Sequence, residues 1–159
     1  MIVPLLREGR VTFRGHHAAV DTVLRPRGPS GTGPPIWIGA KRPRMIRLAA
    51  KYADSWNADW VAAPEQVAGL QRKLEIACEA VGRQPRTLSL TGQVRLQIVQ
   101  SGEAINPDAH FAGKPGEIRE VLLAYSATGL SHLTVDVLAN GVPGVAAIDR
   151  LGSIWSAIG

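Results

Sequence analysis

The sequence predicts an α/β protein in which parallel strands are covered by helices. Two observations support this fold class. From residue 34 onward, short apolar segments typical of strands alternate with longer segments in which apolar residues recur at helical spacing. The chain has 159 residues, of which 45% are apolar and 19% are charged, as expected for one globular domain. Repeated strand–helix units of this kind form either an open doubly wound sheet or part of a (β/α) barrel.

Four segments have the character of strands. The first is a short apolar run, "PIWIGA", with β-branched and aromatic residues bounded by proline and glycine. The longest alternates apolar residues with Ser, Thr, Gln and Arg, which is the two-residue period of a strand. The expected strands cover residues 35–40, 53–61, 88–98 and 130–138.

A helix is expected after each of these strands. The clearest begins near Pro64 and ends at Gly82, with apolar residues at helical spacing between them. The others cover residues 43–53, 113–129 and 145–158. The helix that begins at Pro43 is expected to present an apolar face made of Met45, Ile46, Ala49, Ala50, Tyr52 and Ala53.

Residues 1–33 do not follow this rhythm, and they predict an excursion with short strands and a Gly/Pro-rich loop. The chain 1–159 is therefore expected to be a single module, with 34–159 forming the strand–helix units. The glycines of 28–35 superficially resemble a phosphate-cradling loop. That segment precedes a strand and ends in two prolines, so we interpret it as a connector.

The net charge of +5 is unevenly distributed. Residues 1–51 hold ten Lys or Arg against two acids, and the remainder is slightly acidic. Aromatic residues are only 5% and do not interleave with the cations, which argues against nucleic-acid binding. No apolar run is long enough to span a membrane, and no signal-peptide pattern or disulfide pair is present, so a cytoplasmic location is expected.

The best candidate site is the strand–turn–helix at residues 39–44. Ligands of α/β proteins gather at the carboxyl ends of strands, and the free N–H groups of a helix start bind phosphate. Gly39 and Ala40 are small enough for a ligand to approach the backbone, while Lys41, Arg42 and Arg44 add positive charge beside it. The alternative interpretation is a solvated loop whose cations point into bulk water.

Other polar residues carry weaker signals. The four histidines, His16, His17, His110 and His132, lack the spacing and acidic company of a metal site, so no metal is expected and structural or surface roles are favoured. Ser55 lies in no nucleophile elbow, and Asp54 is expected to cap or pair locally. Trp56 and Asn57 are placed to line a pocket, with core packing as the alternative for Trp56. Asp136 either pairs with a cation or faces a pocket.

The segment "PPIWIGAKRPRMIRLAAKYADSWN" resembles the signature of the luciferase-like monooxygenases, which are flavin- or F420-dependent oxidoreductases built on a (β/α)₈ barrel. "LREGRVTFRGHHAAVDTVLRPRG" is similar to the excursion that precedes this strand in the family. "FAGKPGEIREVLLAYSATGLSHLTVDV" is similar to the family's final unit. The order and spacing of the three segments strengthen the resemblance.

The resemblance implies a partial TIM barrel, the C-terminal half of about four strand–helix units. It also implies that FMN or F420 is the cofactor, with its phosphate held at residues 39–44. The residues expected at the cofactor are Gly39, Ala40, Lys41, Arg42, Trp56, Asn57 and Asp59. A small-molecule substrate is implied, but no residue matches the family's catalytic acid or base. A half-barrel leaves unpaired strand edges and an exposed inner face, so the chain is expected to form a homo-oligomer, to pair with a partner chain that completes the barrel, or to be a fragment of a longer enzyme.

Departures from the family pattern leave the cofactor type open. Ala40 replaces a second glycine, Lys41 and Arg42 replace small residues, and Ser55 replaces the glycine that follows the aspartate. We therefore expect an oxidoreductase or monooxygenase module of the luciferase-like class. The alternative is a noncatalytic half-barrel that binds or oligomerises without turnover.

Overall fold

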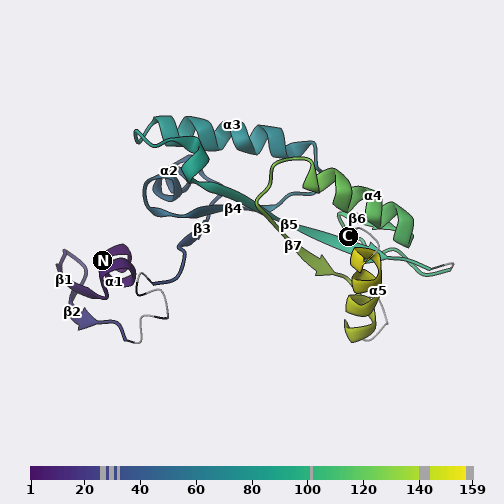
Figure 1. The fold of residues 1–159 in the computed structure, drawn as a ribbon, viewed down its shortest axis with the longest axis horizontal. Helices are drawn as coiled ribbons and strands as arrows, with labels where there is room; N and C mark the ends of the chain where they lie inside the picture. The colour runs from purple at the N-terminus through teal and green to yellow at the C-terminus, as the bar shows by residue number, and fades with distance from the viewer. Residues whose placement is uncertain (26–27, 29–30, 32, 101, 140–143, 157–159) are drawn as a thin grey trace.

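A computed structural model describes residues 1–25, 28, 31, 33–100, 102–139 and 144–156. Its fold is a curled parallel sheet with helices on one face and a separate N-terminal unit beside it (Figure 1). The helices are α1 (Ile2–Glu8), α2 (Pro43–Tyr52), α3 (Gln66–Glu79), α4 (Pro115–Ser126) and α5 (Gly144–Ser156), with a 3-10 turn η1 (Pro85–Thr87). The strands are β1 (Arg10–Arg14), β2 (Ala19–Val23), β3 (Trp37–Gly39), β4 (Ser55–Trp60), β5 (Ser89–Ile98), β6 (Phe111–Gly113) and β7 (His132–Val137).

The main sheet has the strand order of a partial barrel. β4 pairs with β3 on one side and with β5 on the other, and β7 lies along the opposite side of β5; all these pairs are parallel. The short β6 pairs with β5 beyond the point where β4 ends. A helix follows β3, β4 and β7 directly, and α4 follows β5 after β6. These units confirm the predicted α/β class and the partial (β/α)₈ barrel.

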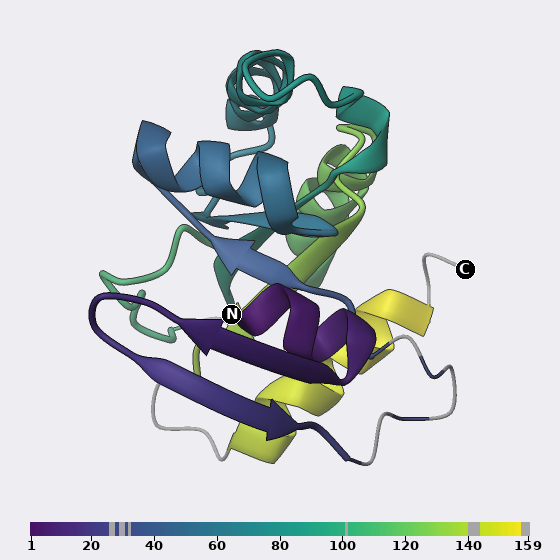
Figure 2. The same ribbon diagram turned by 90° about the vertical axis from the view of Figure 1, so that its left-hand side faces the viewer.

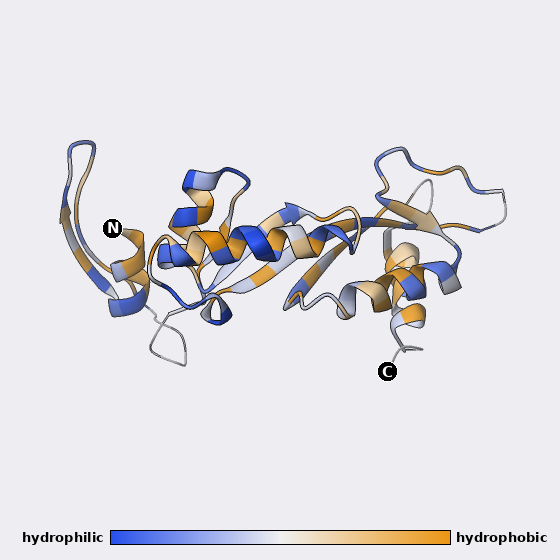
Figure 3. Ribbon diagram, turned by 90° about the horizontal axis from the view of Figure 1, so that it is seen from above, coloured by the Kyte–Doolittle hydropathy of each residue, from blue (hydrophilic) through white to orange (hydrophobic). Residues whose placement is uncertain are grey.

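The hydrophobic core lies between the sheet and its helices. Trp56, Val94 and Leu96 point to this side and are at most 1% exposed, and they join buried residues of α2, α3 and α4. In Figure 3, α3 carries alternating polar and apolar residues, because only one of its faces meets the sheet. The core is therefore complete on the helix side of the strands.

The apolar face predicted for α2 is partly wrong. Ile46, Ala49 and Ala50 are buried as expected, but Met45 and Tyr52 are 42% and 41% exposed. The buried positions follow the i, i+3, i+4 spacing of one narrow stripe, and the two exposed residues lie about 100° around the helix from its centre. The sheet and α3 together cover only that stripe.

The N-terminal unit consists of α1 and the antiparallel β1–β2 hairpin, which confirms the short strands expected there. Figure 2 shows α1 lying beside the hairpin, and Figure 1 shows this unit at the opposite end of the sheet from α4 and α5. The helix α1 and the strand β6 were not predicted. Part of the Gly/Pro-rich connector at 28–35, and the last residues of the helix expected to reach 158, lie outside the described residues.

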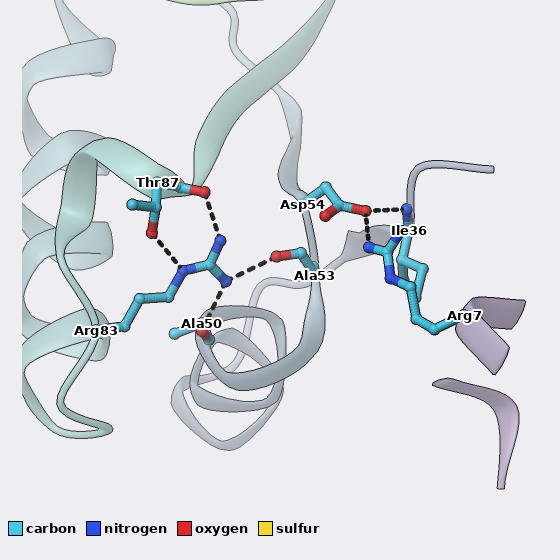
Figure 4. A network of polar contacts seen from close by, with 7 residues as sticks. All are labelled: Arg7, Ile36, Ala50, Ala53, Asp54, Arg83 and Thr87. Atoms are coloured by element: carbon cyan, nitrogen blue, oxygen red, sulfur yellow. Dashed lines mark hydrogen bonds and ion pairs between the residues drawn. The ribbon is translucent and has the colours of Figure 1, made fainter. Parts of the chain in front are cut away.

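Two polar networks hold these elements together (Figure 4). The Asp54 network joins the N-terminal unit to the sheet, and the Arg83 network joins the end of α2 to the loop that follows α3. The Asp54 carboxylate accepts a hydrogen bond of 2.6 Å from the Ile36 N–H and pairs with Arg7 of α1. The expectation of a local partner for Asp54 was wrong, because parallel pairing of β3 with β4 brings Ile36 beside it. The Arg83 guanidinium donates to the carbonyls of Ala50 and Ala53, at 2.9 and 2.7 Å, and so satisfies the end of α2.

Burial by itself would raise the pKa of the Asp54 carboxyl group. The Ile36 hydrogen bond and the positive charges of Arg7 and Arg83 outweigh it, so the pKa lies below its usual value. Asp54 is therefore a charged anchor between the N-terminal unit and the sheet. No helix within the described ranges is long and apolar enough to cross a membrane.

Candidate functional site

An open hollow of about 550 Å³ lies at the carboxyl ends of β3 and β4. Parallel pairing sets Gly39 opposite Asn57, which places the end of one strand beside the end of the next. The residues that line the hollow are Trp37, Gly39, Ala40, Lys41, Asn57, Asp59 and Gln93. Five of the seven residues predicted at the cofactor are thus brought together, and Arg42 and Trp56 do not line the hollow.

Ala40 and Trp56 fix the loop from beneath. The Ala40 N–H donates to the Asn57 carbonyl at 3.2 Å, and the Ala40 carbonyl accepts a 2.8 Å hydrogen bond from Trp56 Nε1. Trp56 is only 1% exposed, so of its two predicted roles the structure shows core packing. Because both backbone groups of Ala40 are used inside the protein, the groups available to a ligand belong to the residues that follow it.

The start of α2 has no internal compensation for its positive end. Its N-cap residue, Arg42, makes no side-chain capping bond, and the first turn contains no acidic residue. Within the described chain, the N–H groups of Lys41, Arg42 and Arg44 have no hydrogen-bond acceptor. An anion is the species that such a helix start favours. The side chains of Arg42 and Arg44 are themselves exposed, as the solvated-loop alternative expects.

Lys41 and Asp59 form an ion pair across the hollow, with Nζ 2.5 Å from Oδ2. Asp59 has a left-handed backbone, φ 68°, and its N–H donates to Asn57 Oδ1 at 2.7 Å. The pairing of β4 with β5 shifts register between Asn57 and Trp60, so a bulge accompanies this turn. The bulge directs the Asp59 carboxylate into the hollow, where it meets Lys41.

Gly39 leaves room for a ligand at the backbone. A Cβ added there would meet no atom within 4 Å, so the space in front of this residue is open. Together with the uncapped helix start and Lys41, this open space fits a phosphate group at the loop. The residues present therefore suit the phosphate end of a flavin or of F420.

A second polar cluster, which the sequence did not indicate, lies on the inner face of the sheet. The Arg95 guanidinium lies 4.2 Å from the centre of the Trp60 ring and 3.3 Å from Asp136 Oδ2. The Trp60 ring meets the ring of His110 edge to face, with centroids 5.3 Å apart. Asp136 thus pairs with a cation, one of its two predicted roles. The polar alternation of 88–98 was the one available signal, because it places Arg95 on the face away from the helices.

The remaining candidates have structural settings. Ser55 is 3% exposed and donates to the Ser89 carbonyl at 3.3 Å. His132 contacts Trp37, at the start of β3, with ring centroids 5.4 Å apart, which shows how strongly the sheet curls. His16 and His17 are exposed and contact each other. Among the described residues, no group of His, Cys, Asp or Glu is arranged to hold a metal ion.

The fold is a partial (β/α) barrel, and an open hollow lies beside an uncapped helix start at the carboxyl edge of its strands. The sequence profile of the family described as luciferase-like monooxygenase matches residues 1–128. The chain belongs to this family.

Relatives and solved structures agree with that assignment. The phthiodiolone/phenolphthiodiolone dimycocerosates ketoreductase of Mycobacterium tuberculosis (strain ATCC 25618 / H37Rv) is 28% identical over 109 residues, which are 64% of this chain and 27% of the relative. An F420-dependent secondary alcohol dehydrogenase in complex with an F420-acetone adduct superposes with a TM-score of 0.69 at 15% identity, covering 98% of this chain and 58% of that one. A riboflavin lyase with modified FMN and riboflavin superposes with a TM-score of 0.67 at 10% identity, covering 94% and 48%.

The chain thus spans about half the length of these solved structures and about a quarter of the mycobacterial relative. At such low identities the solved structures support the fold alone.

Proposed function

We propose that this chain is the cofactor-phosphate-binding half of an F420- or flavin-dependent oxidoreductase. The observation that carries the proposal is the uncapped start of α2 beside Gly39 and Lys41, at the edge of the sheet where ligands of this fold bind. The family match supports a redox cofactor at this edge. The bound cofactor would supply the hydride chemistry, and the protein would place it.

The roles of the chain's own residues follow from their positions. The N–H groups of Lys41, Arg42 and Arg44 would donate to the phosphate oxygens, and Lys41 Nζ would add a charge-assisted contact. Trp56 would hold the loop in shape through Ala40. No residue of this chain is proposed as the catalytic acid or base.

The inner-face cluster of Trp60, Arg95, His110 and Asp136 is the proposed floor for the small-molecule substrate. It offers a flat aromatic surface beside a guanidinium, on the same face of the sheet as the hollow. The names of the mycobacterial relative and of the F420-dependent neighbour both describe the interconversion of a carbonyl compound and its alcohol. A carbonyl or alcohol substrate is therefore the class we propose to test first.

Completion of the barrel by another polypeptide segment is part of this proposal. Among the described strands, β3 and β7 each pair on one side only. The apolar residues Val145, Ile148 and Trp155 of α5 are 64–70% exposed. A second copy, a partner chain or a further segment of a longer protein would cover these edges. Sedimentation of the purified protein over a concentration series tests self-association.

The cofactor proposal is tested by titrating the protein with FMN and with F420 and following fluorescence. We expect saturable binding of at least one of them, and a loss of about tenfold in affinity in the Lys41→Ala/Arg42→Ala variant. Arg86→Ala/Arg119→Ala is the matched control, because it removes the same charge from exposed positions outside the hollow. A folded protein that binds neither cofactor would instead support the noncatalytic alternative.

A further inference from the structure

The hollow beside Gly39 contains one positive and one negative side chain, and the two neutralise each other. Lys41 Nζ lies 2.5 Å from Asp59 Oδ2, and the other lining residues are uncharged. The Lys41 side chain is 66% exposed and the Asp59 side chain 34%. An anion that contacts Lys41 therefore also approaches a carboxylate.

The backbone holds Asp59 in this position. Within the described chain, Asp59 is the one non-glycine residue with a positive φ, and a side chain in this conformation costs about 1 kcal/mol. The Asn57 side chain stabilises the turn by accepting the Asp59 N–H. Because the turn is fixed, the backbone keeps the Asp59 side chain beside the hollow.

We propose that Asp59 shifts the preference of the loop toward a singly charged phosphodiester and away from a doubly charged phosphomonoester, by offsetting the attraction of Lys41 and of the start of α2. The inference rests on the proposed function, since it assumes that the phosphate lies at this loop. Repulsion between Asp59 and the phosphate grows with the charge of the phosphate. At about 4–5 Å in a water-like dielectric, each negative charge weakens binding by about fivefold. Asp59 alone therefore weakens the binding of a dianion about fivefold more than that of a monoanion.

This selectivity bears on the identity of the cofactor. FMN ends in a phosphomonoester, whereas F420 carries a phosphodiester between its ring system and its tail. The Asp59 carboxylate thus favours the phosphodiester class of cofactor at this site. Lys41 attracts the same anion that Asp59 repels, whereas Arg42 and Arg44 do not line the hollow. Removal of the Asp59 charge alone therefore shows how far this carboxylate offsets the attraction of Lys41.

The test compares two flavins that differ only at the phosphate. FMN is a dianion at pH 8, since its second phosphate pKa is about 6, and riboflavin 4′,5′-cyclic phosphate is a monoanion with the same ring. Affinities are measured by fluorescence for the wild type, for Asp59→Asn and for the control Asp149→Asn, which removes an exposed acid of α5. Asparagine tolerates a left-handed backbone, so Asp59→Asn changes the charge and keeps the turn.

We expect Asp59→Asn to tighten FMN binding about fivefold more than binding of the cyclic phosphate, and Asp149→Asn to change neither. Equal changes for the two flavins would overturn the inference, even though flavin binding itself would support the proposed function.

A second measurement separates the two proposals when no flavin binds. Methyl phosphate and dimethyl phosphate are titrated while the backbone amide signals of Lys41, Arg42 and Arg44 are followed by NMR. Asp59→Asn should strengthen the response to methyl phosphate about fivefold more than the response to dimethyl phosphate. No response to either phosphate, or the same gain for both, would refute the role of Asp59.

Discussion

Replacement of Tyr125 by Phe tests how α4 supports the strand that carries the site. The Tyr125 hydroxyl donates a 2.6 Å hydrogen bond to the Val61 carbonyl, directly after β4. Tyr125 is 2% exposed and Val61 is fully buried, so water cannot replace the lost donor. The substitution removes one oxygen and leaves the ring. Loss of the bond with a buried carbonyl left unpaired costs about 2 kcal/mol in the free energy of unfolding.

The raised pKa of Tyr125 adds a pH dependence to this difference. Burial, with a smaller contribution from the negative charge of Glu65, raises the pKa of Tyr125 to about 12 from 10. Two units correspond to about 3 kcal/mol in favour of the neutral hydroxyl in the folded state. This stabilisation is fully present below pH 10, and it is lost as the pH rises through 12.

Urea unfolding of the wild type and Tyr125→Phe, followed by circular dichroism between pH 7 and pH 12, measures both effects. The difference in unfolding free energy should be about 2–3 kcal/mol near pH 7 and should shrink toward zero near pH 12. A difference below about 0.5 kcal/mol at pH 7 would refute the assigned hydrogen bond, and a difference that stays constant up to pH 12 would refute the raised pKa.

Three further substitutions probe the site and its supports. Gly39→Ala should change the free energy of unfolding by less than about 0.5 kcal/mol, because the added Cβ meets no atom within 4 Å. The same substitution should weaken flavin or F420 binding about tenfold, because the methyl group fills the open space. Unchanged affinity would contradict the proposed site. Arg83→Met should lower the free energy of unfolding in urea by about 2–3 kcal/mol, because it removes the donors to the last carbonyls of α2. The control Arg86→Met should lower it little. Equal effects of the two substitutions would refute the capping role of Arg83. Asp54→Asn should cost about 1 kcal/mol at pH 7, a small value because the side chain is 43% exposed. The pKa of Asp54 is lowered in the folded state, so the extra unfolding free energy of the wild type should be present above about pH 4 and should vanish as the pH falls below it. A difference between wild type and variant that stays constant down to pH 3 would contradict the ionic role of Asp54.

The regular elements were predictable where one face of each is buried. The two-residue alternation of 88–98 places Val94 and Leu96 on the helix side, and both are fully buried. The helical spacing of 64–82 likewise predicts α3, where Val67 and Leu74 are buried. The short β6 and the seven-residue α1 could not be predicted in this way, because neither is long enough to show a period and each depends on contacts elsewhere in the chain.

The site was predictable as a loop but not in its contacts. The strand–turn–helix pattern placed Gly39 and Lys41 at the carboxyl edge of the sheet, and both line the hollow. The ion pair of Lys41 with Asp59 depends on a bulge in β4, and the stacking of Arg95 on Trp60 depends on the register between β4 and β5. Strand register joins residues about 35 positions apart, and local sequence carries little information about it.

The two faces of the main sheet explain how a partial barrel can have a complete core. The helix side is apolar, whereas the inner side carries polar residues such as Asn57, Thr91, Gln93, Arg95 and Asp136. A full (β/α)₈ barrel fills its interior mainly with branched apolar side chains. Because this inner face is polar, exposure to water costs it little, and the hydrophobic argument for self-association through that face is weak. The unpaired edges of β3 and β7 and the exposed apolar side of α5 remain as the surfaces that the proposed partner segment would cover. We therefore expect completion of the barrel at these edges, which would leave the inner face open for ligands.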